Sequence, residues 1–194
     1  MSANTKAKTG INTNIRNYTF TGLCIALCIV LPMAFHAIPN AGSVILPMHI
    51  PVFICGFVCG WPFGLVCGIT GPLLSSLLTG MPPAAILPSM MAELAVYGVV
   101  SGLLIKFVKT KNIVADLYIS LIGAMLAGRV IAGIVKALMF AKGTFTIMTW
   151  ITAHFVTSVP GIVIQLAFIP ALYLALQGAK IIPKKYTDTG SKDE

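Results

Sequence analysis

Charge is scarce in this sequence, and negative charge is the scarcest. Only 9% of the 194 residues are charged, with five acidic residues against thirteen basic ones, whereas 57% are hydrophobic. A soluble domain carries about 25% charged residues, so most of this surface is not built to face water. Several apolar runs approach the roughly 20 residues that cross a bilayer. The sequence therefore predicts an integral membrane protein.

Patterns typical of enzymes are missing as well. There is no GxxxxGK[ST] phosphate loop, so the chain lacks the usual means of hydrolysing ATP. An intramembrane metalloenzyme would need clustered carboxylates or a histidine–carboxylate set, and Glu93 is the only acid that we assign to the membrane region. Ser75, Ser76 and Ser158 have no base and orienting acid at a suggestive spacing. We predict no enzymatic activity and no cofactor in this chain.

The five cysteines show no pattern of a secreted disulfide framework, since all lie within apolar runs. Cys24 and Cys28, and also Cys55 and Cys59, are four residues apart, a spacing that puts two thiols on one helix face. No histidine or CxxC pair reinforces a metal site of this kind. Free cysteine is commonly a small buried residue, so we predict no metal ion here.

Basic residues gather beside the apolar runs, and no stacking aromatics alternate with them. This pattern indicates the positive-inside rule of membrane proteins, not nucleic-acid binding. It predicts that both chain ends lie in the cytoplasm. The three groups are Lys6, Lys8 and Arg16; Lys106, Lys109 and Lys111; and Lys180, Lys184, Lys185 and Lys192.

We predict an all-α fold of six transmembrane helices, which occupy a membrane domain over residues 18–177. A cytoplasmic segment, 1–17, precedes this domain, and a basic cytoplasmic tail, 178–194, follows it. Four helices are expected to cross the membrane singly, at about Tyr18–Ala37, Ala84–Phe107, Ile113–Phe140 and Thr152–Gln177.

Residues 48–79 are expected to form a hairpin of two short helices. A single crossing there would place the three lysines at 106–111 on the wrong side of the membrane. Pro62 marks the turn, at residues 60–63, because proline lacks an N–H and disfavours helical geometry in the residue before it. Glycines recur at 56, 60, 64 and 68, a spacing that gives each leg a face for close helix packing.

Ionisable residues inside the membrane are the strongest functional signal, because each costs several kcal/mol unless it is paired or hydrated. Glu93 and Arg129 should lie at matching depths, roughly 13 and 16 Å from the outer ends of their helices. Lys136 follows on the same face of its helix, nearer the outside. A structural Glu93–Arg129 ion pair is one interpretation. The additional Lys136 favours an outward-facing basic cavity that receives an anion.

Four phrases carry a family resemblance: LPMAFHAIPNAGSVILPMHIPVFICGFVCG, PLLSSLLTGMPP, AGRVIAGIVKA and PGIVIQLAFIPAL. With six helices, basic ends and no ATPase motif, residues 18–177 resemble the S component of an energy-coupling factor (ECF) vitamin transporter. The resemblance implies a substrate-binding subunit that captures a vitamin from outside a bacterial plasma membrane. It also implies docking on a transmembrane coupling protein with two ATPase subunits.

The resemblance assigns roles to particular positions. The family's small-residue face for the coupling protein corresponds to Gly22 and Ala26, with glycine in place of the first alanine. The loops that close the family's pocket correspond to Ile38–Pro47 and Thr79–Pro88. We expect gating by Pro47, Met81, Pro82 and Pro83. We expect substrate binding by Asn40, His49, Glu93, Tyr97, Arg129, Lys136 and His154.

The sequence says less about the identity of the substrate. Two cations against one carboxylate favour a small anionic vitamin, and the phrases LPMHIPV and SSLLTGMPP look most like S components assigned to pantothenate. Riboflavin, pyridoxine-type and queuosine-precursor ligands stay open as alternatives. A self-sufficient facilitator or channel is also open, although no obvious inverted repeat of the kind common in secondary transporters is present.

Overall fold

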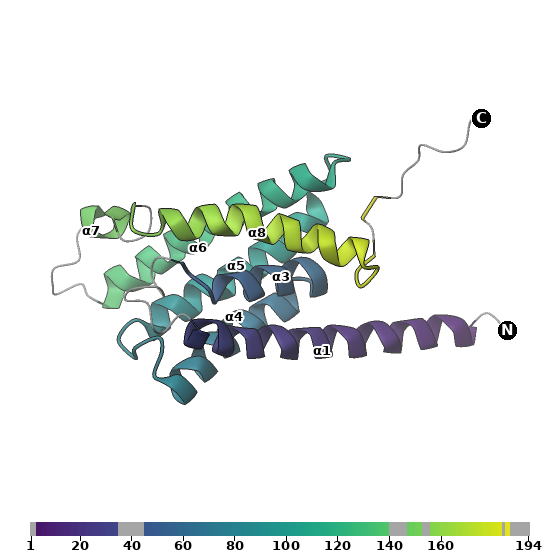
Figure 1. The fold of residues 1–194 in the computed structure, drawn as a ribbon, viewed down its shortest axis with the longest axis horizontal. Coiled ribbons are helices and arrows are strands. Elements are labelled where there is room, and N and C mark those ends of the chain that lie inside the picture. The colour runs from purple at the N-terminus through teal and green to yellow at the C-terminus, as the bar shows by residue number, and fades with distance from the viewer. Residues whose placement is uncertain (1–2, 35–44, 140–146, 153–155, 184, 187–194) are drawn as a thin grey trace.

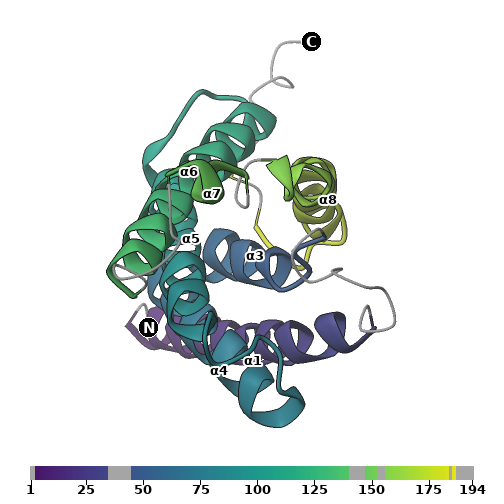
Figure 2. The same ribbon diagram turned by 90° about the vertical axis from the view of Figure 1, so that its left-hand side faces the viewer.

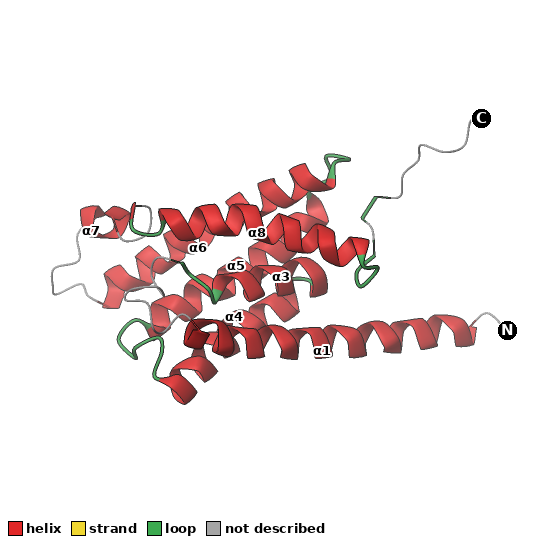
Figure 3. Cartoon of the chain, in the orientation of Figure 1, coloured by secondary structure: helices red, strands yellow, loops and turns green. Residues whose placement is uncertain are grey.

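In this computed structural model, the described residues are 3–34, 45–139, 147–152, 156–183 and 185–186, and their regular elements are all helices (Figures 1 and 3). Five of the helices, α1, α4, α5, α6 and α8, are long and apolar enough to cross a membrane. The fold class predicted from the sequence is therefore confirmed. The helices are α1 (Ala3–Ala34), α3 (His49–Cys59), α4 (Trp61–Thr79), α5 (Leu87–Phe107), α6 (Ile113–Met139), α7 (Ile147–Ile151) and α8 (Val159–Gly178).

The long helices form one bundle with its connections at two ends (Figure 1). Helix α1 begins and α8 ends at one end of the bundle, and α7 lies at the other. Figure 2 looks along the bundle from the α7 end and shows α3 between α1 and α8. The most extensive packing joins α4 to α5 and α5 to α6. This arrangement is the one that the predicted topology requires, while the cytoplasmic location of the chain ends stays a prediction.

The predicted hairpin is confirmed as α3 and α4, which meet at Gly60. Gly60 has φ +91°, a backbone conformation that glycine adopts without a steric penalty. Pro62 lies in the first turn of α4, where its missing N–H leaves no hydrogen bond unmade. Thus Gly60 supplies the turn and Pro62 starts the second leg.

The two legs of the hairpin differ in length. Helix α3 has 11 residues, too few to cross a bilayer, whereas α4 has 19 and is long enough. The prediction of two short helices is therefore confirmed for α3 and wrong for α4. Helix α3 packs against α1, α4, α5 and α8, and nearly all of its residues are buried. The short helix therefore lies inside protein, where its ends are kept away from lipid that could not satisfy their backbone groups.

Three glycines allow the hairpin to approach α5 closely. A Cβ added at Gly64 would clash with the backbone of Gly98, one at Gly68 with the backbone of Leu94, and one at Gly56 with Gly98 and Ser101. The prediction of a small-residue packing face is confirmed. In such a contact, backbone meets backbone, and van der Waals packing replaces the side chains that are absent.

Two helix boundaries differ from the sequence prediction. Helix α1 begins at Ala3, well before Tyr18, so the polar start of the chain extends the first helix. The single helix predicted over 152–177 is interrupted, because residues 157 and 158 form a turn and α8 begins at Val159. Pro160 accounts for the new start, since proline is favoured in the first turn of a helix and not in its interior.

We expect Gly64→Ala to destabilise the bundle by about 1–3 kcal/mol or more, because the added methyl meets a backbone that cannot rotate away. Thermal unfolding of the purified protein in detergent would measure the loss. Gly178→Ala is the matched control, because a Cβ there meets nothing within 4 Å. Equal melting temperatures for the two variants would contradict the packing role of Gly64.

Candidate functional site

A buried carboxylate lies where α3 and α5 meet. The Tyr97 hydroxyl donates a hydrogen bond of 2.7 Å to Oε1 of Glu93, one turn earlier on α5. His49 Nε2, at the start of α3, is 3.9 Å from the same oxygen. All three side chains are buried. The structure thus brings together three of the residues predicted to bind substrate, while their role in binding stays a prediction.

Aromatic rings hold this cluster in place. The Tyr97 ring stacks on Phe53 at 4.7 Å and contacts the His49 ring at 5.4 Å. On its other side Tyr97 presses against α6 at Gly128, where an added Cβ would clash with the ring. Because the rings leave Tyr97 little freedom, its hydroxyl stays directed at Glu93.

Arg129 joins the same region from α6. The guanidinium is only 2% exposed, and its Nη1 donates a hydrogen bond of 2.8 Å to Oγ of Ser158, just before α8. Trp150 of α7 donates from Nε1 to the Arg129 carbonyl oxygen at 3.3 Å. Arg129 also lies close enough to Tyr97 to interact with its hydroxyl. A single arginine therefore links α6 to α7, to α8 and to the cluster on α5.

Lys136 lies further along α6 and is half-buried. The charge of Glu93 acts on the Lys136 ammonium group. Glu93 consequently has two cationic neighbours, Arg129 and Lys136. The local balance of one negative and two positive groups suits the binding of an anion.

The remaining predicted residues lie at the α7 end or outside the described part of the chain. Pro47 precedes α3, and residues 81–83 lie between α4 and α5, where Ser76 Oγ donates to the Pro82 carbonyl oxygen at 2.8 Å. Asn40, His154 and most of the first predicted gating loop fall outside the described residues. Ser158 and Trp150 were missed as site residues, although Pro160 could have marked Ser158 as a helix start.

The chain was compared with known proteins in three ways. Residues 16–173 match the family model described as ECF transporter, substrate-specific component. The chain belongs to this family. Searches of curated proteins and of solved structures found no match. The chain is therefore a multi-pass membrane protein and the substrate-binding component of a transporter that works with other ECF subunits, as the resemblance implied.

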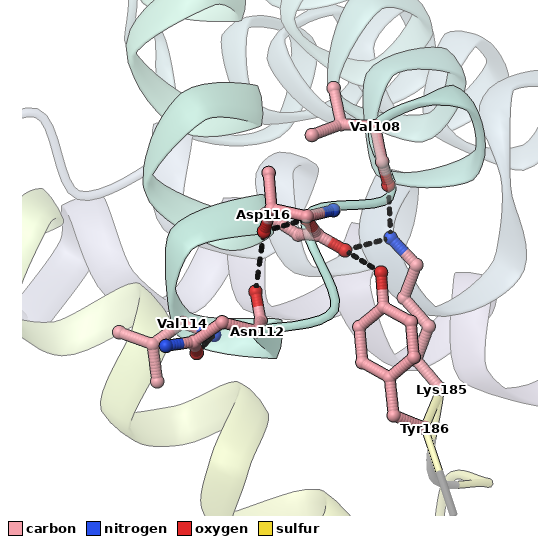
Figure 4. Close-up of polar contacts among 7 residues, drawn as sticks. Val108, Asn112, Val114, Asp116, Lys185 and Tyr186 are labelled. Carbon is pink, nitrogen blue, oxygen red and sulfur yellow. Dashed lines mark hydrogen bonds and ion pairs between the residues drawn. The ribbon is translucent and has the colours of Figure 1, made fainter.

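A second polar cluster lies at the end of the bundle away from α7, and it shows that one prediction from the sequence was wrong (Figure 4). Asp116, in the first turn of α6, is fully buried, so Glu93 is not the only acid in the membrane-spanning helices. The backbone N–H and hydroxyl of Thr110 donate to Oδ1 at 2.8 and 2.7 Å. Lys185 Nζ and the Tyr186 hydroxyl donate to Oδ2, the latter at 2.6 Å.

The Asp116 cluster attaches residues 185–186, which follow α8, to the turn between α5 and α6. Lys185 also donates to the Val108 carbonyl oxygen at 2.6 Å. By accepting its hydrogen bond, Asp116 raises the pKa of the Tyr186 hydroxyl above the ordinary value of 10.0. The bond therefore persists at neutral pH and is lost as the pH rises through that pKa. Lys185 was predicted to be a topology signal, but it is also a structural partner.

The cysteines lie where α1, α3 and α4 meet. Cys55 Sγ is 3.6 Å from the Thr21 hydroxyl, and Cys28 Sγ is 3.6 Å from the Met48 carbonyl oxygen. Across the described residues, no group of three or more potential ligands is placed to hold a metal ion. These thiols fill the narrow space between helices, as small buried side chains do.

Proposed function

We propose that this S component captures a small anionic vitamin or vitamin precursor from outside a bacterial plasma membrane, with pantothenate the favoured ligand. The observation that carries the proposal is one buried carboxylate, Glu93, in a region with two cations: Glu93 and Arg129 both act on the Tyr97 hydroxyl, and the charge of Glu93 acts on Lys136. A ligand carboxylate would neutralise the surplus positive charge. It would also form charge-assisted hydrogen bonds, which are stronger than neutral ones.

A ligand from outside the membrane can reach this buried site only if the bundle opens at the end where the ligand enters. The turn that carries Met81, Pro82 and Pro83, and Pro47 before α3, lie at the α7 end. In the proposed function these residues gate the entry of the ligand. The basic groups at the other end support the cytoplasmic location of both chain ends.

The partners are a transmembrane coupling protein and two ATPase subunits. Gly22 and Ala26 on α1 are exposed, and a Cβ at Gly22 would meet nothing within 4 Å. Cys24 and Cys28, on the other side of α1, are buried against the bundle. A small-residue face that packs on no neighbour within the described chain suits close approach by a helix of the coupling protein.

Purified S component in liposomes should bind pantothenate without accumulating it, because the sequence holds no phosphate loop for ATP hydrolysis. Radiolabelled uptake with ATP on either side of the membrane, together with a filter-binding assay, would check both halves. Addition of the coupling protein and ATPases should restore accumulation. Downhill flux through the chain alone would contradict the proposal and favour a facilitator.

Gly22→Leu and Ala26→Leu should abolish uptake in cells while leaving ligand affinity unchanged, because a bulky side chain blocks close helix approach. Uptake and calorimetry would be measured on the same variants. Leu23→Ala is the control, since Leu23 is an exposed neighbour outside the small-residue face. Full uptake by the double Gly22/Ala26 variant would sink the docking role, and lost ligand binding would place this face within the bundle.

Arg129→Met should weaken pantothenate binding by about 2 to 4 kcal/mol, roughly 30- to 1,000-fold, because a buried guanidinium is little screened by water. Lys136→Met should cost about 1 kcal/mol and show more salt dependence. Glu93→Gln should weaken an anion modestly, through poorer positioning of Arg129. Calorimetry on the three variants decides the case. Unimpaired binding by Arg129→Met, with collapse in Glu93→Gln, would instead indicate a cationic or hydroxyl-rich ligand.

A further inference from the structure

Gln165, in the middle of α8, is a polar side chain with no visible structural task. It is 0% exposed, and neither its amide nitrogen nor its amide oxygen has a hydrogen-bond partner among the described residues. Buried polar groups in proteins are nearly always paired, and each exception needs an explanation. In a helix that could span a membrane, water from bulk solvent does not supply the partner.

His49 has the same property. Within the described chain neither ring nitrogen has a hydrogen-bond partner, and its nearest acidic oxygen, on Glu93, is 3.9 Å away, beyond hydrogen-bonding distance. His49 is a residue of the candidate site, so its unpaired nitrogens already point to a ligand there. The question is whether Gln165 faces the same ligand.

The register of α3 and α8 answers this question. The two helices run in the same direction and meet where the rings of Phe57 and Tyr173 are 6.1 Å apart (Figure 1). His49 comes about two turns before Phe57, and Gln165 comes about two turns before Tyr173, a rise of about 12 Å on each helix. Gln165 and Tyr173 belong to the buried face of α8, which recurs every four residues, and His49 and Phe57 are buried on α3. Although α3 crosses α8 obliquely (Figure 2), Gln165 and His49 therefore both lie about two turns from this contact, toward the α7 end.

The charged groups of the candidate site lie at the depth of Gln165 or nearer the α7 end of the bundle. Ser158, which accepts the hydrogen bond of Arg129, precedes Gln165 by about two turns of chain, roughly 10 Å toward the α7 end. Helix α8 also packs less extensively on the bundle than α4, α5 and α6 pack on one another. A ligand between α8 and α3 would thus meet a cation near its outer end and neutral polar groups deeper in.

We propose that Gln165 is a substrate-binding residue, which hydrogen-bonds an amide or hydroxyl group of a ligand whose carboxylate is held by Arg129. The side-chain amide offers two donors and an acceptor, which together match an amide or a pair of hydroxyls. His49, also on the α7 side of the Phe57–Tyr173 contact, would hydrogen-bond the same ligand through its ring nitrogens. This inference rests on the proposed function and narrows the ligand to an elongated carboxylate with a neutral polar group roughly 10 Å away.

The test uses the full-length S component in detergent, with calorimetry against pantothenate, riboflavin, pyridoxine and a queuosine precursor. Gln165→Met keeps the length of the side chain but removes its hydrogen bonds, and Gln165→Asn keeps the amide but shortens its reach. Ser120→Ala is the matched control. Its hydroxyl is equally buried and has no partner within the described chain, but it lies on α6 nearer the Asp116 end.

We expect Gln165→Met to weaken pantothenate binding about 10- to 100-fold, with Gln165→Asn intermediate and Ser120→Ala unchanged. The ligand-free Gln165→Met protein should melt at the wild-type temperature or above, because an unpaired buried amide has been removed. Wild-type affinity in Gln165→Met would overturn the inference. A lower melting temperature or a failure to fold would also overturn it, since either result assigns Gln165 a structural role.

The same titrations separate this inference from the proposed function. If the wild type binds only one of the ligands without a carboxylate, the anionic substrate is wrong. The carboxylate part of the inference then fails too, but substrate binding by Gln165 stands if Gln165→Met weakens that ligand and fails if it does not. A wild type that binds none of the four ligands contradicts both proposals.

Discussion

Glu93 is the residue on which the packing of the α7 half of this bundle depends. A carboxylate inside a membrane is tolerated only when protein groups replace the water it has lost. Here Tyr97 donates a hydrogen bond to it, His49 lies beside it, and the cations of α6 act on it. Each partner comes from α3, α5 or α6, so satisfying one charge fixes the relative positions of three helices. The same groups are those that a polar ligand would contact.

The short helix α3 makes this arrangement feasible. Because α3 begins at His49, its first turn lies beside the buried Glu93. A helix N-terminus carries partial positive charge, which favours negative groups near it. The glycines at 56, 64 and 68 let the hairpin lie directly on the α5 backbone, so α3 can be fully enclosed. Close packing of small residues thus supports a polar site that lipid alone would exclude.

The sequence predicted those features that depend on composition or on local chain geometry. The counting of lysines and the position of Pro62 gave the hairpin, and the cost of buried charge drew attention to Glu93 and Arg129. The sequence did not predict pairs between residues that are far apart along the chain, such as Lys185 with Asp116 and Arg129 with Ser158. No periodicity in a sequence encodes which helix faces which. Gln165 was overlooked because burying a single amide in an apolar run costs much less free energy than burying a charge, and the sequence analysis looked for charges. The start of α8 was misplaced because Pro160, which marks the first turn of a helix, was not used as a boundary.

Helix α8 is held at both ends by charged groups of α6, and this has a consequence for transport. At one end Asp116 binds Lys185 and Tyr186, which follow α8. At the other end Arg129 binds Ser158, just before α8. In the proposed function a ligand carboxylate would share Arg129 with Ser158, whereas the Asp116 cluster would not change. Ligand binding would then alter the outer attachment of α8 and leave the inner one fixed. An empty and a loaded S component would therefore differ mainly at the α7 end, while the exposed face of Gly22 and Ala26 on α1 would stay the same in both.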